Sequence, residues 1–163
     1  MFKKPLIAAM LLLAFAAPAL AVTGGSGTGA ANDPTQQDLG SMSIATGFNS
    51  TANGGSSISI GGFSGAGASS VALGAGAYSV DSGGFGSNVA VGSSTQATGG
   101  MASALGFSAT ASGVGASAFG YKSQATGASS DAFGINSQAP GANSFAGGDG
   151  SQARAVGSTA VGT

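Results

Sequence analysis

The sequence contains no cysteine, histidine, tryptophan or glutamate, and charged residues make up only 6% of it. Without cysteine the chain forms no disulfide, so its stability outside a cell must come from another source. General acid–base catalysis would depend on scattered aspartates and a few other groups, and the many serines have no neighbouring base to activate them. We therefore predict that the protein is not an enzyme and that it uses no cofactor.

Positive charge is sparse. Beyond residue 21 the basic residues are Lys122 and Arg154, against five aspartates, so this part of the chain has a formal charge of −3. Binding to nucleic acid through its phosphates requires clustered lysine and arginine. We expect no nucleic-acid partner.

The first 21 residues differ from the rest of the chain. Lys3 and Lys4 form a basic start, residues 6–17 are apolar, and residues 19–21 (Ala-Leu-Ala) have the small-x-small pattern of a cleavage site. This is the layout of a secretory signal peptide, with an apolar part too short to span a bilayer; the alternative is an uncleaved anchor helix. We predict a signal peptide at 1–21 and a flexible lead-in at 22–41, which lacks bulky apolar residues and any period.

Glycine, in contrast, is abundant and periodic. The chain has 32 glycines, and from residue 42 onwards about half of them recur at intervals of seven, with a slip of phase between 61 and 92. Abundant glycine without a period would indicate disorder, whereas a regular period indicates a repeat fold. The longest regular series consists of Gly92, Gly99, Gly106, Gly113, Gly120, Gly127, Gly134, Gly141 and Gly148.

Pairs of seven residues make a unit of 14 with two unlike halves. One half has the pattern x-Ala-Φ-Gly with an apolar Φ, and the other has a polar or small third residue, as in Gln96-Ala-Thr-Gly99. Short alternating segments between glycine and serine are typical of strands and turns, and no helical period is present. We predict an all-β fold, a parallel β-roll (solenoid) of about nine coils of about 14 residues. The Φ positions hold Leu73, Val91, Leu105, Phe119, Phe133 and Val161.

Strand alternation separates the alanines from the Φ residues. We expect one line of alanines between the two sheets, where only a methyl group fits, and the Φ residues on the opposite side of their strands. Ordering so many glycines is entropically costly, and a thin roll lined by alanine buries little apolar area in return. The Φ residues are therefore our candidate interchain core, which predicts a symmetric side-by-side oligomer. The alanine line comprises Ala72, Ala90, Ala104, Ala118, Ala132, Ala146 and Ala160.

The motif Ser70-Val-Ala-Leu-Gly74 recurs in the variants Asn88-Val-Ala-Val-Gly92 and Ser158-Thr-Ala-Val-Gly162. Together with the two unlike halves of each unit, it resembles the head repeats of YadA-like trimeric autotransporter adhesins over residues 42–163. The resemblance implies a left-handed roll, a homotrimer, a bacterial surface or extracellular location, and adhesion to host matrix proteins, cells or surfaces.

Such adhesins continue into a stalk and a membrane anchor. The present sequence shows no sustained heptads and ends at Thr163 in phase with the repeat. We expect no membrane anchor within this chain, which would then be a head fragment or a free-standing secreted relative.

Three bulky apolar residues, Phe107, Tyr121 and Ile135, follow glycines at a spacing of 14. We expect them to stack on successive coils, either as part of the core or interchain contact or as an exposed adhesive stripe. Gly147-Gly-Asp-Gly150 is similar to a calcium-binding turn of other β-rolls. The position that would need aspartate holds Gln152, so we predict a turn aspartate and no metal site.

Two other functions compete with adhesion, which we favour. One is a structural subunit of an extracellular filament or matrix, formed by coils that stack end to end. The other is a flat surface that orders water or ice through a regular column of hydroxyl groups three residues after glycine. That column comprises Ser50, Ser64, Thr95, Ser123, Ser137 and Ser151.

Overall fold

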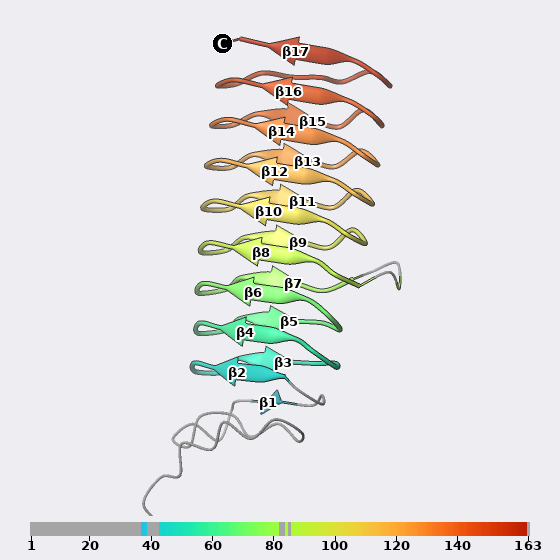
Figure 1. The fold of residues 1–163 in the computed structure, drawn as a ribbon. Helices are drawn as coiled ribbons and strands as arrows, with labels where there is room; N and C mark the ends of the chain where they lie inside the picture. The colour runs from blue at the N-terminus through green and yellow to red at the C-terminus, as the bar shows by residue number, and fades with distance from the viewer. Residues whose placement is uncertain (1–36, 39–42, 82–83, 85, 163) are drawn as a thin grey trace, which may run out of the picture.

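A computed structural model describes residues 37–38, 43–81, 84 and 86–162. The predicted segments 1–21 and 22–41 lie outside the described residues, apart from 37–38. The described residues form an all-β parallel solenoid with about 14 residues and two short strands per turn, and with about eight turns (Figure 1). The fold prediction is confirmed.

Within these ranges, 17 strands form two parallel sheets on opposite sides of the coil. The eight-stranded sheet consists of β1 (Gln37–Asp38), β3 (Thr51–Ala52), β5 (Gly65–Ala66), β7 (Tyr78–Ser79), β9 (Gln96–Ala97), β11 (Thr110–Ala111), β13 (Gln124–Ala125) and β15 (Gln138–Ala139). The nine-stranded sheet consists of β2 (Ile44–Thr46), β4 (Ile58–Ile60), β6 (Val71–Leu73), β8 (Val89–Val91), β10 (Ser103–Leu105), β12 (Ser117–Phe119), β14 (Asp131–Phe133), β16 (Phe145–Gly147) and β17 (Thr159–Val161).

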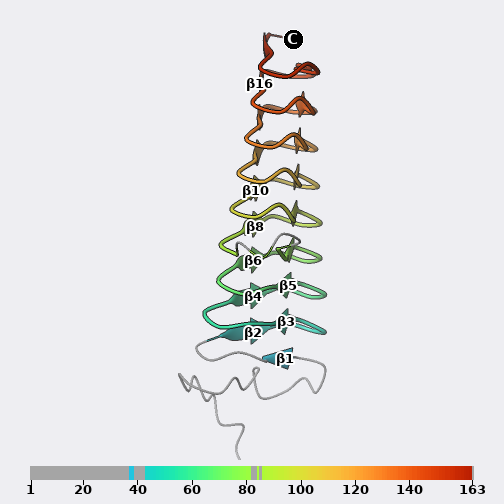
Figure 2. The same cartoon turned by 90° about the vertical axis from the view of Figure 1, so that its right-hand side faces the viewer.

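The coil is left-handed, as the resemblance implied. In Figure 1 the chain climbs from the N-terminal coils to the C-terminal end. The strands of the nine-stranded sheet, on the near side, run to the left, and those of the eight-stranded sheet behind them run to the right. Figure 2, turned by 90°, shows the two sheets edge-on and confirms which is nearer in Figure 1.

The space between the sheets is filled by very small side chains. In the coil from Ser117 to Ser130 the inward residues are Ala118, Ser123, Ala125 and Ser130, and each has 0% of its surface exposed. In the nine-stranded sheet Ala118 pairs in register with Ala104 and with the equivalent alanine of the following coil. The predicted line of alanines is confirmed, and the largest fully buried side chains among the described residues are those of Asn88 and Thr95.

The column of hydroxyl groups points into the coil, so the hypothesis of an ice-binding surface is wrong. Of its residues Ser151 is the most exposed, at 7%. In most of them the hydroxyl satisfies a carbonyl of its own turn: Ser123 Oγ donates to the Gly120 carbonyl at 3.1 Å and Ser137 Oγ to that of Gly134 at 3.0 Å. Most buried hydroxyls in proteins have such a partner, and Ser50 is the exception in this column. The sequence alone did not distinguish a surface column from one that closes turns.

Replacing one of these serines by alanine is expected to cost little. Ser130 Oγ donates to the Gly127 carbonyl at 2.7 Å, and in the two preceding coils the same position holds the buried alanines Ala102 and Ala116. The Ser130→Ala variant leaves room for a methyl group and loses one neutral hydrogen bond, so its free energy of unfolding should fall by about 1 kcal/mol. Urea denaturation followed by circular dichroism measures this. A loss of several times that amount would show that the hydroxyl is essential to the turn.

Glycine serves a different purpose in each half of the unit. Gly120, which follows the apolar half, has a φ of +137°. Gly113, in the polar half, has no positive φ, but a Cβ there would overlap the Gly127 carbonyl oxygen of the next coil. In the polar half the requirement is close approach alone, whereas Gly120 combines a positive φ with a similarly close approach to Gly134 of the next coil.

The slip of phase near residue 80 does not interrupt the strand pairing of the eight-stranded sheet. Tyr78 keeps its register with Gly65 and Gln96, so the longer connection follows β7. The inserted residues belong to the connection between β7 and β8, in which residues 82–83 and 85 lie outside the described residues. At the other end, β1 pairs with β3 in register, so the ladder begins before residue 42, where the sequence analysis had placed its start.

Candidate adhesive surfaces

One outer side of the solenoid is apolar over most of its length. In each strand of the nine-stranded sheet the central residue points inward, so the residues on either side of it point outward. We call this surface the apolar face. It comprises Ile44, Ile58, Ile60, Val71, Leu73, Val89, Val91, Leu105, Phe119, Phe133, Phe145 and Val161.

Every predicted Φ residue lies on the apolar face and is half-buried or exposed in the single chain. Phe133 is 37% exposed and Val161 is 77% exposed. The predicted separation of Φ residues from the alanine line is therefore confirmed, whereas their role in an interchain contact stays a prediction.

The sequence analysis missed the second column of the apolar face. Ile44, Ile58, Val71, Val89 and Phe145 stand two positions before the Φ column and point in the same direction. The alternation of strand side chains was the signal that could have found them, because Val71-Ala72-Leu73 already contains both columns.

Aromatic rings continue the apolar face where the Φ column is interrupted. Phe119 and Phe133 stack with centroids 4.9 Å apart, and Phe133 meets Phe145 at 5.8 Å. The next Φ position is Gly147, where a Cβ would lie 2.7 Å from Phe145 Cε1. The ring of Phe145 thus occupies the space that a side chain at position 147 would need, and the ladder of rings is preserved.

The predicted stripe of Phe107, Tyr121 and Ile135 lies on turns that follow β10, β12 and β14. These residues are 49%, 44% and 50% exposed, so they form no part of the core of the single chain. Phe107 and Tyr121 stack with centroids 5.6 Å apart, and Lys122 Nζ lies 5.1 Å from the Tyr121 centroid. The structure leaves open the two outward roles, contact with another chain and adhesion.

The other outer side of the solenoid is polar. Outward positions of the eight-stranded sheet hold glutamine or threonine in most coils, as in Gln96, Thr110 and Gln124, which are paired in register. The two sides of one thin coil therefore differ strongly in chemistry, which suits a chain with one side against its own copies and the other toward solvent.

Neither a metal cluster nor a membrane helix is found in the part of the chain that the structure describes. No three histidine, cysteine, aspartate or glutamate residues there come together to hold a metal ion. Asp149, the residue of the calcium-like motif, is exposed on a turn. The same residues include no helix long and apolar enough to cross a membrane.

Comparison with known proteins identifies the repeat. The family model of the YadA head domain repeat, in two copies, matches residues 39–64, 97–123, 111–130 and 125–151. The interval from 65 to 96 between these matches contains the slip of phase and the longer connection between β7 and β8. Among curated proteins, none matches the sequence.

The matched family is non-enzymatic. YadA head domains are surface-exposed parts of outer-membrane autotransporters, and YadA-family adhesins are trimeric and bind host molecules. This chain therefore carries YadA head domain repeats over residues 39–64 and 97–151, and such repeats imply the trimeric autotransporter adhesin family.

Proposed function

We propose that this chain is the surface-exposed head of a bacterial adhesin, that three copies associate side by side through the apolar face, and that the assembly attaches to host matrix proteins, cells or surfaces. The observation that supports it most strongly is the contrast between core and surface. Among the described residues, the core contains side chains no larger than those of alanine, serine, threonine and asparagine, while the phenylalanines lie outside it.

Burial of the apolar face explains how such a thin coil is stable. Burying apolar surface is worth about 25 cal/mol per Å², and a core of methyl groups supplies little of it. Contiguous exposed apolar surface on this scale usually marks a contact site. Because the face runs along the whole solenoid, parallel copies related by a rotation axis would bury it from end to end.

The export of the chain is part of the same proposal. Residues 1–21 have the layout of a signal peptide, and a cysteine-free fold is indifferent to an oxidising compartment. In the trimer, the polar side and the turns would be the surfaces left for a host ligand. Among the turns, those that bear Phe107, Tyr121 and Ile135 form the apolar stripe that the sequence predicted.

A double variant of the stripe tests the adhesive role. The purified chain should bind immobilised collagen or another matrix protein saturably, and Phe107→Ser with Tyr121→Ser should weaken that binding about tenfold or more, because exposed aromatic anchors carry much of the energy of a contact. Surface plasmon resonance with a concentration series measures the affinity.

The matched control is Val114→Ser, which removes an apolar side chain of similar exposure, 41%, from a different turn. Its affinity should equal that of the unmodified chain. Fibres that grow with concentration and an absence of saturable binding would contradict adhesion and favour a structural filament. An equal loss in the control and the double variant would contradict the assignment to the stripe.

A further inference from the structure

One coil lacks its outward side chains on the polar side of the solenoid. Strand β5 and the residue after it read Gly65-Ala66-Gly67, and Ala66 points into the core. Gly65 pairs in register with Thr51 on one side and Tyr78 on the other. The outer layer of side chains therefore has a gap one coil wide, between rows that lie two strand spacings, about 9.6 Å, apart.

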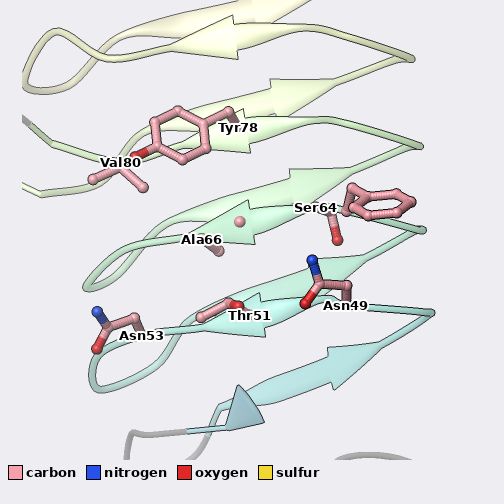
Figure 3. A pocket seen from close by; sticks show the side chains of 9 residues that line it. Asn49, Thr51, Asn53, Ser64, Ala66, Tyr78 and Val80 are labelled. Atoms are coloured by element: carbon pink, nitrogen blue, oxygen red, sulfur yellow. The ribbon is translucent and has the colours of Figure 1, made fainter. Parts of the chain in front are cut away.

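The gap forms an open hollow of about 360 Å³. Tyr78 and Val80 stand along one side of it, and Asn49, Thr51 and Asn53 stand along the other (Figure 3). A volume of this size lies within the range of small-molecule sites. It continues into a second hollow over Gly67 that shares Asn53 and Val80 and reaches Asp81.

The walls of the hollow combine an aromatic surface with polar, uncharged groups. Tyr78 is 47% exposed and Phe63, at one end, is 64% exposed. A Cβ on Gly65 would lie 3.2 Å from Tyr78 Cδ2, so the tyrosine ring extends over the glycine. Two amide side chains and one hydroxyl supply donors and acceptors, as the alcohol groups of a neutral ligand require.

The floor of the hollow has no free backbone groups to offer an extended peptide. Gly65 N–H donates to the Ala77 carbonyl at 2.9 Å, and Gly67 N–H donates to that of Ser79 at 2.8 Å. Peptides that bind by adding a strand need an unpaired edge, which the middle of this sheet does not have. The carboxylate of Asp81, which accepts from Gly86 N–H at 2.6 Å, lines the second hollow and disfavours an anionic ligand.

We propose that this hollow binds a neutral oligosaccharide, with one sugar ring against the face of Tyr78 and its hydroxyl groups bonded to Thr51, Asn49 and Asn53. The inference deepens the proposed adhesive function and rests on it, because it assigns a class of host ligand to the head. Residues 65–96, which supply Gly65, Tyr78 and Val80, lie between the segments that the family model matches. One side of the hollow therefore lies outside the matched repeats, whereas Asn49, Thr51 and Asn53 on the other side lie within the matched segment 39–64.

The experiment uses the purified chain in its native assembly on an array of neutral hexose and N-acetylhexosamine oligosaccharides, with sialylated oligosaccharides and a proline-rich peptide as comparison probes. Neutral oligosaccharides should bind and the sialylated ones should not. Calorimetry with the best neutral probe should then show an affinity about tenfold weaker or lost in Tyr78→Ala and in Gly65→Gln. The second variant fills the hollow with glutamine, the residue found in the same outward column at position 124. Gly65 has no positive φ, so its backbone accepts a side chain without strain.

Gln124→Ala is the matched control, since it alters the same column four coils away and should keep full affinity. Absence of neutral saccharide binding, or binding that both hollow variants retain, would overturn the proposal. Peptide binding with the same sensitivity to Gly65→Gln would overturn the assignment to a saccharide. If matrix proteins still bind while saccharides do not, the saccharide site fails and the adhesive function stands; if neither binds, both fail.

Discussion

A Gly120→Ala variant is expected to lose about 3 kcal/mol or more of its free energy of unfolding, or to fail to fold. Gly120 has a φ of +137°, a conformation that residues with a side chain rarely adopt. A Cβ there would also overlap the Gly134 carbonyl oxygen and lie 2.8 Å from the carbonyl carbon. Both strain and overpacking are destabilising by about 1–3 kcal/mol each, and backbone in the next coil cannot move aside without breaking its own ladder.

Urea denaturation followed by far-ultraviolet circular dichroism measures this effect, with Gly150→Ala as the control. Gly150 also has a positive φ, +64°, but a Cβ there meets no atom within 4 Å. The equivalent position is Asn136 in the preceding coil and Lys122 in the coil before that, and both have a φ near +55°. The free energy of unfolding of the control should therefore fall by only about 1 kcal/mol. Equal losses in the two variants would show that contact with the next coil is unimportant.

This contrast between glycines shows how much the sequence could predict. The interval of seven identified the turns, and the unequal halves identified the strand of each coil that bears the apolar Φ residues, because both are local properties that recur in every coil. The direction of side chains within a strand followed from alternation alone. These features needed no knowledge of long-range contacts, since each coil of a solenoid repeats the environment of its neighbours.

Features that depend on the width of the coil could not be predicted. The hydroxyl column was interpreted as a possible surface because the sequence does not say which side of a turn faces inward. The answer comes from the small separation of the sheets, which admits Ser123 or Thr95 but leaves Phe119 outside. The hollow over Gly65 was missed for a related reason: it requires Thr51 and Tyr78 to be neighbours across a coil that follows a slip of phase.

The second large effect concerns assembly. The unmodified chain should have the solution mass of three copies, independent of concentration, by light scattering. A Phe133→Glu variant should shift that mass to a single chain, because Phe133 lies at the centre of the ring ladder, 4.9 Å from Phe119 and 5.8 Å from Phe145. A rotation axis would bring together three unpaired carboxylates at an apolar contact, each with a large desolvation cost.

The control is Gln138→Glu, which introduces the same charge on the polar side of the neighbouring strand β15 and should leave the mass at three chains. Circular dichroism separates assembly from folding.

A Phe133→Glu chain that is monomeric yet retains its β-signal would show that the alanine core folds alone. Loss of both the trimer mass and the β-signal would show that the thin coil depends on its partners. A single-chain mass for the unmodified protein would contradict the proposed trimer, and a mass that climbs with concentration would indicate end-to-end assembly. The Phe133→Glu variant thus tests whether the solenoid folds as a single chain or only as one of three associated chains.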